Sequence, residues 1–370
     1  MKILLSGGGT GGHIMPALAV ARSIKDKMPK AKLLFVGSTK PAEKELVESA
    51  GLQFKAISSG KIRRYFDLQN VIDIFRVFRG VAQARRIVRE FAPDVVFAKG
   101  GYASYPMVVA AGSMGIPVVA HESDMRVGLS NRLGFKYMKK LATSFPVAEV
   151  KKNSTKVIAE SNKLVETGLP IQQQLLSVVA KKPFANGRPT LMITGGSQGA
   201  SYINQVVAEV LRDLLPVVNI VHYTGTRDFE VINSVYQALG DEFNGKWMVK
   251  DFDTQDFHGL LKGSDLVLSR AGSTVFELEV LAKPVILVPL PGSAGNHQLL
   301  NAKYLDKQGG AVMIEQDKFN SESLVKIIKK LVANPAQMKQ MAGRMKEMGQ
   351  VHIKAADMIA DLVLAEVKNG

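Results

Sequence analysis

The sequence contains no cysteine among its 370 residues. A disulfide framework and a zinc site built on thiolates are therefore excluded, and the absence fits a reducing compartment. No uninterrupted stretch of about 18 apolar residues occurs, so no segment predicts a membrane-spanning helix. The apolar start of the chain ends at glycines after Leu5, so we expect no signal peptide.

Acidic residues are scarce in the first half of the chain only. Residues 1–163 carry 27 Lys and Arg against 12 Asp and Glu, whereas residues 164–370 carry 21 of each kind. The whole formal charge of +15 therefore belongs to the first half. We expect an anionic partner there, and nucleic acid, an acidic bilayer and a phosphorylated substrate all satisfy this expectation.

What the sequence does contain is an alternation of short apolar runs with helical patterns, which predicts parallel sheets covered by helices. In the first half we expect strands at residues 2–6, 32–37, 53–57, 95–98, 117–121 and 141–144. The pattern restarts after a polar stretch, with strands expected at 190–194, 218–223, 247–250, 266–269 and 285–288. Hydrophobic residues make up 46% of the chain, enough for two doubly wound α/β units that meet near 164–175. A single helix is expected at 341–367.

Glycines dominate the segment GGGTGG at residues 7–12, between the first expected strand and a helix expected at 16–24. The segment satisfies G-x-G-x-x-G, a weak signal that glycines needed only for chain reversal would also give. A dinucleotide site requires an acid at the end of the second strand, where residues 37 and 38 are Gly and Ser. A Walker A loop is excluded because His13, not a Lys-Ser/Thr pair, follows the last glycine. The amide groups still suit a diphosphate.

His13 itself has two interpretations. Histidine titrates near neutral pH and can accept a proton from a hydroxyl group, so His13 can be a general base beside a bound diphosphate. Alternatively, it is a helix-start residue with a local hydrogen bond.

Two later clusters repeat this chemistry. GGSQGA at residues 195–200 again joins a strand to a helix, and the Ser197 hydroxyl can donate to a phosphate oxygen. Within residues 266–302 a strand ends before Arg270, and the next helix carries Glu277. Its carboxylate can accept both hydroxyls of a ribose, or it can be a solvated residue favoured at a helix start. Two glycine loops facing one cleft imply two phosphorylated ligands, or one ligand between two binding sites.

Five segments in this order resemble the MurG family, the UDP-N-acetylglucosamine:lipid I N-acetylglucosaminyltransferases of peptidoglycan synthesis in glycosyltransferase family 28. They are GGGTGGHIMPALA (7–19), KGGYASYP (99–106), HESD…GLSNR (121–132), GGSQGASYINQ (195–205) and SRAGSTVFE…NHQLLNA (269–302). The stretch ISSGKIRRY (57–65) resembles the Gram-positive type of the family. The resemblance spans nearly the whole chain.

The resemblance implies a GT-B fold, with two Rossmann-like doubly wound domains facing an interdomain cleft. Residues 1–165 would form an N-terminal domain that binds lipid I and associates with the membrane. Residues 166–345 would form the C-terminal domain that binds UDP-GlcNAc. The helix at 346–370 would pack back on the N-terminal domain.

The implied reaction is inverting hexosyl transfer from UDP-GlcNAc to the C4 hydroxyl of MurNAc in lipid I, which gives lipid II. The catalytic residues carried over from the family are His13, Tyr102 and Glu122. The residues expected to bind UDP-GlcNAc are Thr10, Gly11, Gly12, Asp124, Asn131, Gln172, Gly196, Ser197, Gln198, Phe252, Arg270, Gly272, Ser273, Thr274, Glu277, His297 and Gln298.

Two departures from the family pattern concern the donor site. Gln172 stands where the family often carries an arginine, so a salt contact to the donor is lost or supplied elsewhere. The segment RAGSTVFE, which ends at Glu277, is one residue shorter than the usual spacing between arginine and glutamate.

No cofactor or divalent metal is needed in the proposed mechanism, because amide groups at helix starts would stabilise the departing UDP. No D-x-D pair stands where a metal clamp would be expected, and DFD (251–253) is better interpreted as a polar loop. The expected partners are UDP-GlcNAc, lipid I, an anionic inner-leaflet membrane surface, and cell-wall and division proteins. Nucleic acid is not expected, since no nucleic-acid motif is recognisable.

The segment at residues 61–89 carries eight Lys and Arg with apolar residues between them. This mixture suits a helix or loop lying on an anionic leaflet, although about half of the apolar side chains are expected in the core. A peripheral position at the cytoplasmic face of the cell membrane follows. The alternatives are a related GT-B glycolipid glycosyltransferase, a hydrolysing UDP-GlcNAc 2-epimerase and a non-catalytic nucleotide-sugar sensor at the membrane.

Overall fold

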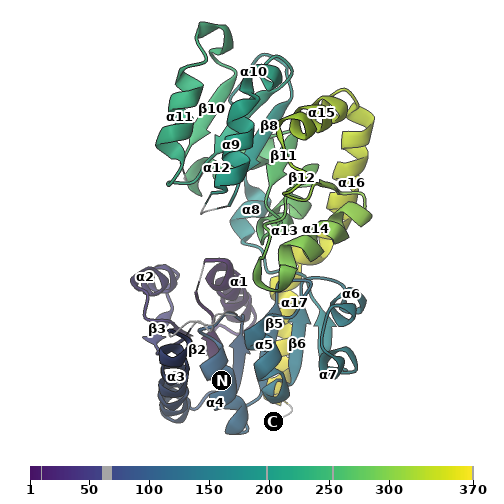
Figure 1. The fold of residues 1–370 in the computed structure, drawn as a ribbon. Helices are drawn as coiled ribbons and strands as arrows, with labels where there is room; N and C mark the ends of the chain where they lie inside the picture. The colour runs from purple at the N-terminus through teal and green to yellow at the C-terminus, as the bar shows by residue number, and fades with distance from the viewer. Residues whose placement is uncertain (10, 61–68, 197–198, 252–253, 369–370) are drawn as a thin grey trace. The chain divides into compact units, whose positions relative to one another are not determined.

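The computed structural model describes the chain apart from residues 10, 61–68, 197–198, 252–253 and 369–370. Its contacts divide it into two compact units, one of Met1–Gln172 with Val351–Gly370 and the other of Gln173–Gln350. In Figure 1 the yellow C-terminal helix lies among the purple and blue elements of the first unit. That unit is therefore assembled from both ends of the chain.

The first unit is built on a parallel sheet of order β3-β2-β1-β4-β5-β6-β7. Its strands are β1 (Lys2–Ser6), β2 (Lys32–Gly37), β3 (Gln53–Ala56), β4 (Val95–Ala98), β5 (Val118–Glu122), β6 (Lys140–Thr143) and β7 (Leu164–Glu166). Its helices are α1 (Gly11–Lys27), α2 (Pro41–Ser49), α3 (Gln69–Phe91), α4 (Tyr105–Ser113), α5 (Leu129–Gly134), η1 (Phe135–Tyr137), α6 (Val147–Lys152), α7 (Lys156–Ala159) and α17 (Ala355–Lys368). The inner strands are apolar almost throughout because helices cover both faces of the sheet.

The second unit is built on a parallel sheet of order β10-β9-β8-β11-β12-β13. Its strands are β8 (Thr190–Thr194), β9 (Asn219–Tyr223), β10 (Trp247–Lys250), β11 (Leu266–Ser269), β12 (Val285–Leu287) and β13 (Ala311–Met313). Its helices are α8 (Gln173–Ser177), α9 (Ser201–Glu209), α10 (Leu211–Leu214), α11 (Phe229–Gln237), η2 (Asp241–Phe243), α12 (Thr254–Gly263), α13 (Thr274–Val280), η3 (Ala294–Asn296), α14 (His297–Lys307), α15 (Ser321–Val332) and α16 (Pro335–Ile353).

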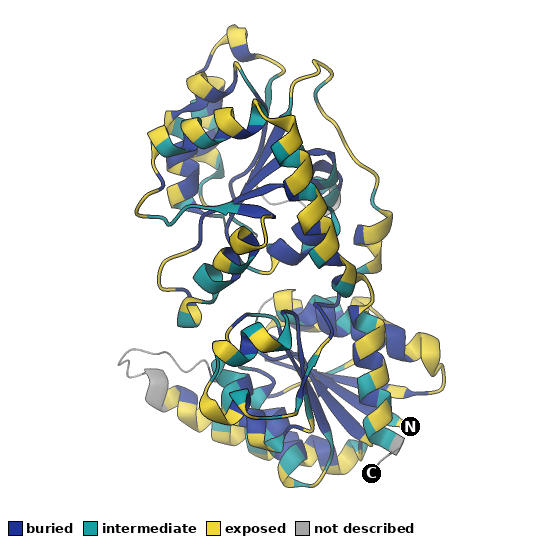
Figure 2. Cartoon of the chain, turned by 90° about the vertical axis from the view of Figure 1, so that its right-hand side faces the viewer, coloured by how far each residue is buried: buried dark blue, intermediate teal, exposed yellow. Residues whose placement is uncertain are grey.

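Each sheet is the buried layer of its unit, and exposure is concentrated on the outer faces of the helices (Figure 2). In the first unit Ile3 of β1 packs with Ile14 and Ala17 of α1. Ile359 and Val363 of α17 complete the same core. Burial of such side chains stabilises the unit by about 1.5–3 kcal/mol each.

Both sheets reverse their strand order next to a glycine loop. The chain runs outward from β1 to β3 and returns to β4 on the other side of β1; it runs from β8 to β10 and returns to β11 on the other side of β8. In open parallel sheets, ligands bind outside the carboxyl ends of the strands at such a reversal. The loops at 7–12 and 195–200 begin at these two points.

The predicted fold class, α/β with two doubly wound parallel sheets, is confirmed. The strands expected at 2–6, 32–37, 95–98, 190–194, 247–250 and 266–269 have the observed bounds, and the other expected strands shift by one residue. The sequence does not predict β7 and β13. Each has three residues at the edge of a sheet, too few for an apolar run to stand out.

Two helix predictions are wrong. Helix α1 begins at Gly11 rather than at Pro16, because a proline this early removes a single i→i−4 hydrogen bond and the helix continues through it. The segment expected as one helix at 341–367 breaks at Lys354. The break has a packing reason: Gly349 of α16 lies against the backbone of Glu279, whereas α17 packs on α1.

Candidate active site

Glycines let three loops of the first unit approach each other at the carboxyl ends of β1, β4 and β5. Gly9 lies against the Tyr102 ring, where a Cβ atom would come within 2.7 Å of a ring carbon. Gly101 has a φ of +80° and lies against the Gly8 carbonyl and the His13 ring. A larger residue at either glycine would push the loops apart. The structure thus brings predicted residues His13 and Tyr102 to one edge of the sheet.

His13 lies in the first turn of α1, half-buried, with its Nδ1 atom enclosed. Among the described residues that atom has no hydrogen-bond partner. Burial, together with the nearby Lys99 ammonium, lowers the pKa of His13 to about 3. The imidazole is therefore neutral near pH 7 and has a lone pair available for a proton.

Lys99 follows β4 at the reversal of the strand order, and its side chain is almost fully buried. Its Nζ atom donates to the Ser123 hydroxyl at 2.6 Å. Burial lowers the pKa of Lys99 to about 8, against the opposing effect of the Glu122 and Asp124 carboxylates. Lys99 belongs to the segment KGGYASYP, but the sequence analysis assigned it no functional role. The signal that could have identified it is a lysine that follows an apolar strand and precedes two glycines.

The Glu122 carboxylate is directed at the loop that follows it. It accepts hydrogen bonds from the backbone N–H groups of Asp124 (3.0 Å) and Gly128 (2.8 Å), and from Nδ2 of Asn131 (3.0 Å). Asn131 also donates to the His121 carbonyl at 2.9 Å. Burial and the Asp124 carboxylate raise the pKa of Glu122. The predicted residues Glu122, Asp124 and Asn131 are thus joined in one network that holds residues 123–128.

A second carboxylate, missed by sequence reasoning, occupies the first glycine loop. Glu43 of α2 is buried and accepts from the backbone N–H of Gly9 (2.7 Å) and of Ser38 (2.8 Å). Lys40 donates to the Gly9 carbonyl at 2.9 Å. The acid absent from positions 37 and 38 is therefore supplied by the first turn of α2. Because the Gly9 N–H group already donates to Glu43, the part of the loop that remains suited to an anion is the start of α1, at Gly11 and Gly12.

The second glycine loop has the same need for small residues. A Cβ at Gly195 would overlap the backbone of Ala200, and one at Gly199 would overlap the Thr224 carbonyl. Gly196 has a φ of +77° with open space beside it, and its N–H donates to the Thr194 hydroxyl at 3.1 Å. The predictions for Ser197 and Gln198 in this loop, like those for Thr10 and Phe252, fall outside the described residues.

The turn between β11 and α13 contains Arg270, whose guanidinium group is held from two sides. It donates to the Val288 carbonyl at 3.0 Å and to Oε1 of Gln316 at 2.8 Å. The residue is 8% exposed, and burial lowers its pKa to about 10. Asn301 donates to the Ala271 carbonyl at 3.2 Å and fixes the same turn.

Several predicted donor-binding residues gather around this turn. Gly272 lies beside the Gln298 side-chain amide, and Ser273 and Thr274 begin α13. Oε1 of Gln298 accepts from the Leu290 N–H at 2.9 Å, and Nδ1 of His297 lies 2.8 Å from the Ala294 carbonyl. The amide groups of the helix start and the side chains of α14 therefore lie at the carboxyl ends of β11 and β12.

Glu277, expected to hold a ribose, lies in the first turn of α13. Its carboxylate is 3.6 Å from Nε2 of His258 on α12, and both side chains are about one-third exposed. A partly exposed carboxylate at this position can accept hydrogen bonds from hydroxyl groups of a ligand. His258 is a further residue near the site that sequence reasoning did not find.

The comparisons with known proteins agree with this geometry. The N-terminal domain of glycosyltransferase family 28 matches residues 3–143, and the C-terminal domain of the same family matches residues 190–356. The chain belongs to glycosyltransferase family 28.

Among relatives of this family 28 chain is a UDP-N-acetylglucosamine–N-acetylmuramyl-(pentapeptide) pyrophosphoryl-undecaprenol N-acetylglucosamine transferase of Clostridium kluyveri. It is 38% identical over 89% of this chain and 91% of its own length. The crystal structure of MurG from Acinetobacter baumannii superposes with a TM-score of 0.76 at 25% identity, covering 99% of this chain and 100% of that one. A UDP-GlcNAc 2-epimerase from Neisseria meningitidis, 16% identical with a TM-score of 0.67 over 99% of this chain and 100% of that one, shares the fold.

The predicted donor-binding residues of the family 28 chain are divided between the units. Gly11, Gly12, Asp124, Asn131 and Gln172 belong to the first unit, where Gln172 is its last residue before the second unit. Thr10 falls outside the described residues, and the others belong to the second unit. Within the described ranges no group of three or more His, Asp or Glu side chains is arranged to hold a metal ion. The described helices include none that is both long and apolar enough to span a membrane.

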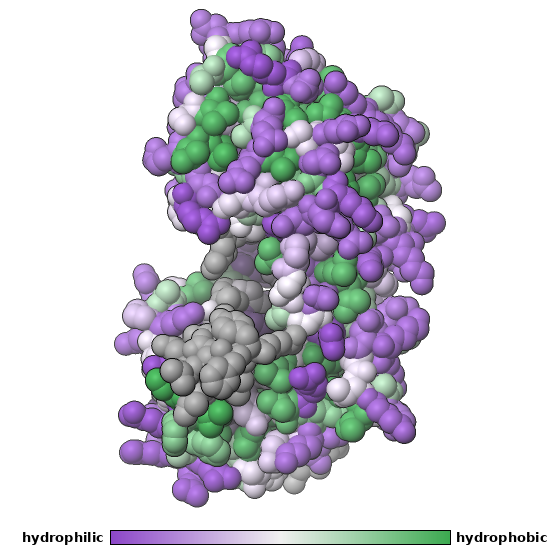
Figure 3. Space-filling model, in the orientation of Figure 1, coloured by the Kyte–Doolittle hydropathy of each residue, from purple (hydrophilic) through white to green (hydrophobic). Residues whose placement is uncertain are grey.

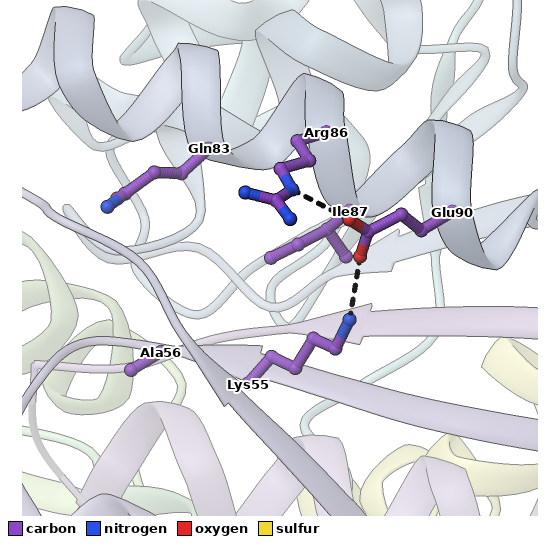
Figure 4. A pocket seen from close by; sticks show the side chains of 6 residues that line it. All are labelled: Lys55, Ala56, Gln83, Arg86, Ile87 and Glu90. Atoms are coloured by element: carbon purple, nitrogen blue, oxygen red, sulfur yellow. Dashed lines mark hydrogen bonds and ion pairs between the residues drawn. The ribbon is translucent and has the colours of Figure 1, made fainter.

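A surface cavity of about 270 Å³ in the family 28 chain lies at the outer edge of the first sheet (Figure 4), lined by Lys55, Ala56, Gln83, Arg86, Ile87 and Glu90. The Glu90 carboxylate accepts from Arg86 at 2.7 Å and from Lys55 at 3.0 Å. These charges are paired with each other, and β2 separates the cavity from the reversal between β1 and β4. We therefore place the candidate site at the glycine loops and not in this cavity.

Proposed function

We propose that this chain transfers GlcNAc from UDP-GlcNAc to the C4 hydroxyl of MurNAc in undecaprenyl-pyrophosphoryl-MurNAc-pentapeptide, giving lipid II. The observation that carries the proposal is the alignment with the Clostridium kluyveri transferase over 89% of the chain. Both glycine loops and both strand-order reversals fall within family 28 domains. The chain is accordingly a hexosyltransferase of peptidoglycan synthesis.

The donor binds to the second unit in this proposal. The loop at 195–200 and the start of α13 present amide groups toward the diphosphate, where helix dipoles favour negative charge. Glu277 accepts the ribose hydroxyls, and His297 and Gln298 contact the sugar. The partly exposed Glu277 carboxylate and the position of Gln298 beside Gly272 support these roles.

The acceptor binds to the first unit, and His13 is the general base. The C4 oxygen attacks the anomeric carbon from the face opposite UDP, a new glycosidic bond forms, and the bond to the UDP oxygen breaks with inversion. His13 takes the hydroxyl proton. Its neutral imidazole supports this role. Amide groups stabilise the charge on departing UDP, so the proposed mechanism needs no metal ion.

Helix α3 is the proposed membrane face. Ile72, Ile74, Phe75 and Phe78 are exposed, the two phenylalanines at 70% each. Arg76 and Arg79 are exposed on the same helix, and Figure 3 shows hydrophobic surface in the area where Figure 1 shows α3. Exposed aromatic residues among arginines favour the interface of an anionic leaflet. The enzyme would bind peripherally at the cytoplasmic face, where lipid I is its substrate.

The decisive experiment supplies the full chain with UDP-GlcNAc and a soluble lipid I analogue, and measures UDP release and the disaccharide product by mass spectrometry. We expect both in equal amounts. UDP-GlcNAc binding without turnover would indicate a nucleotide-sugar sensor. Transfer to a diacylglycerol acceptor instead of the analogue would indicate a glycolipid transferase. UDP release in the absence of the analogue would indicate a hydrolysing epimerase. Each of these three results would contradict the proposal.

A further inference from the structure

The Glu277 carboxylate has hydrogen-bonding capacity that the fold leaves unused. It lies in the first turn of α13, and its side chain is about one-third exposed. The two oxygens of a carboxylate together accept about four hydrogen bonds. Among the residues that the structure describes, the one side chain paired with this carboxylate is His258, whose Nε2 atom lies 3.6 Å from Oε2 of Glu277. The carboxylate therefore retains acceptor positions for hydroxyl groups of a ligand.

Packing at the start of α12 brings His258 to this carboxylate. The preceding residue, Phe257, is buried, and its ring meets the Tyr223 ring edge-on with the centroids 5.1 Å apart. Tyr223 is the last residue of β9 and pairs with Thr194, the last residue of β8. The start of α12 is thus anchored at the carboxyl ends of these strands, next to the strand that leads into the second glycine loop.

The contact between the two side chains restrains the carboxylate and leaves it open to a ligand. A separation of 3.6 Å exceeds a hydrogen bond, but an imidazole N–H at this distance attracts the nearer carboxylate oxygen. The imidazole is itself restrained, because its ring centroid lies 5.4 Å from that of Phe257. A ligand that immobilises a freely rotating side chain loses affinity through the ordering cost, and a side chain restrained beforehand reduces that cost.

We propose that His258 positions the Glu277 carboxylate for the two hydroxyl groups of a ribose, and so increases the selectivity of the donor site for ribonucleotides. The inference rests on the proposed function, because it takes Glu277 to accept the ribose hydroxyls. His258 is a positioning residue, since it acts through Glu277 and needs no contact with the nucleotide. It lies outside the segments that carry the family resemblance, the nearest of which begins at residue 269.

The test compares UDP with 2′,3′-dideoxyuridine 5′-diphosphate, which keeps the uracil and the diphosphate and lacks both hydroxyl groups. Isothermal titration calorimetry on the full chain gives the ratio of the two affinities. We expect the unmodified chain to favour UDP about tenfold or more, as for hydroxyl groups bound by a charged acceptor. In His258→Ala this ratio should fall about three- to tenfold, the cost of ordering one long side chain on binding. Affinity for the dideoxy nucleotide should stay within about twofold.

Three further variants separate positioning from packing. His258→Gln keeps a side-chain N–H group directed at Glu277 and should retain the ratio within about twofold. Glu277→Ala should lower the ratio by itself, and adding His258→Ala to it should lower the ratio no further, because the two residues act through one interaction. Gln237→Ala, at an exposed position of α11, should change neither affinity.

The possible outcomes distinguish this inference from the proposed function. Equal losses of both nucleotides in His258→Ala, or an unchanged ratio, would overturn the inference. A loss in His258→Gln as large as in His258→Ala, or a further fall of the ratio when His258→Ala is added to Glu277→Ala, would also overturn it. Failure of the unmodified chain to bind UDP, or equal affinity for the two nucleotides, would instead contradict the donor site of the proposed function.

Discussion

At the scale of single residues, the enclosed Nδ1 atom of His13 determines how this side chain titrates. Its pKa of about 3 means that protonation does not remove the base anywhere between about pH 5 and pH 9. A base with such a low pKa also has a small intrinsic affinity for protons. Its efficiency then depends on direct contact with the hydroxyl group that it deprotonates.

Substitution of His13 tests this assignment. His13→Ala should lower kcat by about 10²–10⁴-fold through loss of the base, while KM for UDP-GlcNAc changes little because the proposed donor site lies in the second unit. The rate of the unmodified enzyme should show no decline attributable to His13 as the pH falls from 7 to 5. A decline centred near pH 6.5 that disappears in His13→Ala would contradict the burial of this imidazole.

Glu122 gives a stability prediction at the same scale. In Glu122→Gln one oxygen is replaced by an NH₂ group; when the remaining oxygen accepts from Gly128 and Asn131, the NH₂ group faces the Asp124 N–H, which loses its acceptor. The free energy of unfolding should fall by about 2–3 kcal/mol, as for a buried donor that loses its acceptor. Urea denaturation followed by circular dichroism measures the loss. Glu160→Gln, at an exposed position of the same unit, is the matched control, and equal stability of the two variants would be inconsistent with the observed network.

At the scale of secondary-structure elements, α3 combines a packed face with an exposed one. Gly80 lies against the Ser58 carbonyl and Pro106, and Ala84 is buried. The exposed phenylalanines belong to its N-terminal half. The sequence predicted that about half of the apolar residues at 61–89 lie in the core. In the structure Ile72, Ile74, Phe75 and Phe78 are all exposed, so this part of α3 is available to a partner.

Removal of the two aromatic rings tests the membrane face. Phe75→Ser with Phe78→Ser should reduce flotation with phosphatidylglycerol vesicles about tenfold or more, since each buried ring contributes about 1.5–3 kcal/mol. Val157→Ser, at a position of the first unit that is 72% exposed, should have no effect. Equal flotation of the double variant and the control would contradict the proposed orientation, as would equal binding to vesicles without anionic lipid.

The elements also indicate what sequence patterns can predict. Buried parallel strands such as β1 and β4 are continuous apolar runs, and the sequence predicts their bounds. The break between α16 and α17 is not encoded by a proline or glycine at Lys354. It results from packing on two different units, and a helical pattern contains no information about which unit each half contacts.

At the scale of the whole molecule, buried neutral histidines make stability depend on pH. Burial lowers the pKa of His222 to about 3, against an opposing effect of Asp228. Because the unfolded chain, with an ordinary histidine pKa near 6.5, binds more protons than the folded one below that pH, unfolding becomes easier as the pH falls from about 6.5 toward 3. The pKa of His222 is lower in the folded than in the unfolded chain, so its contribution to stability is fully present above pH 6.5 and decreases below it.

This linkage predicts a measurable difference for His222. Lowering the pH from 7 to 5 should cost about 2 kcal/mol more in the unmodified chain than in His222→Gln, which cannot titrate. The single tryptophan, Trp247, contacts Tyr236 with the ring centroids 5.0 Å apart, and the Tyr236 hydroxyl lies 3.3 Å from Nδ1 of His222. Its fluorescence therefore reports the unit that holds the titrating group. Identical pH dependence in both proteins would contradict the pKa assigned to His222.

The whole arrangement of the site could be predicted only in part. His13 was found because it stands next to glycines after an apolar run, whereas Gln298 was found through the resemblance of its segment to the family. Glu43 and His258 were not, because they reach the site from α2 and from α12. Sheet order decides which distant segments meet, and no local pattern records that order.

The contribution of α17 to the first core has a consequence for biosynthesis. Ile359 and Val363 of α17 leave the ribosome after the whole second unit, yet they pack with α1, which leaves before it. The second unit is one continuous segment of the chain and can fold before α17 is synthesised. The first unit cannot complete its core until α17 is present. Translation that stops between the second unit and α17 would therefore release a folded second unit attached to an incomplete first unit, with apolar side chains of α1 exposed to chaperones and proteases.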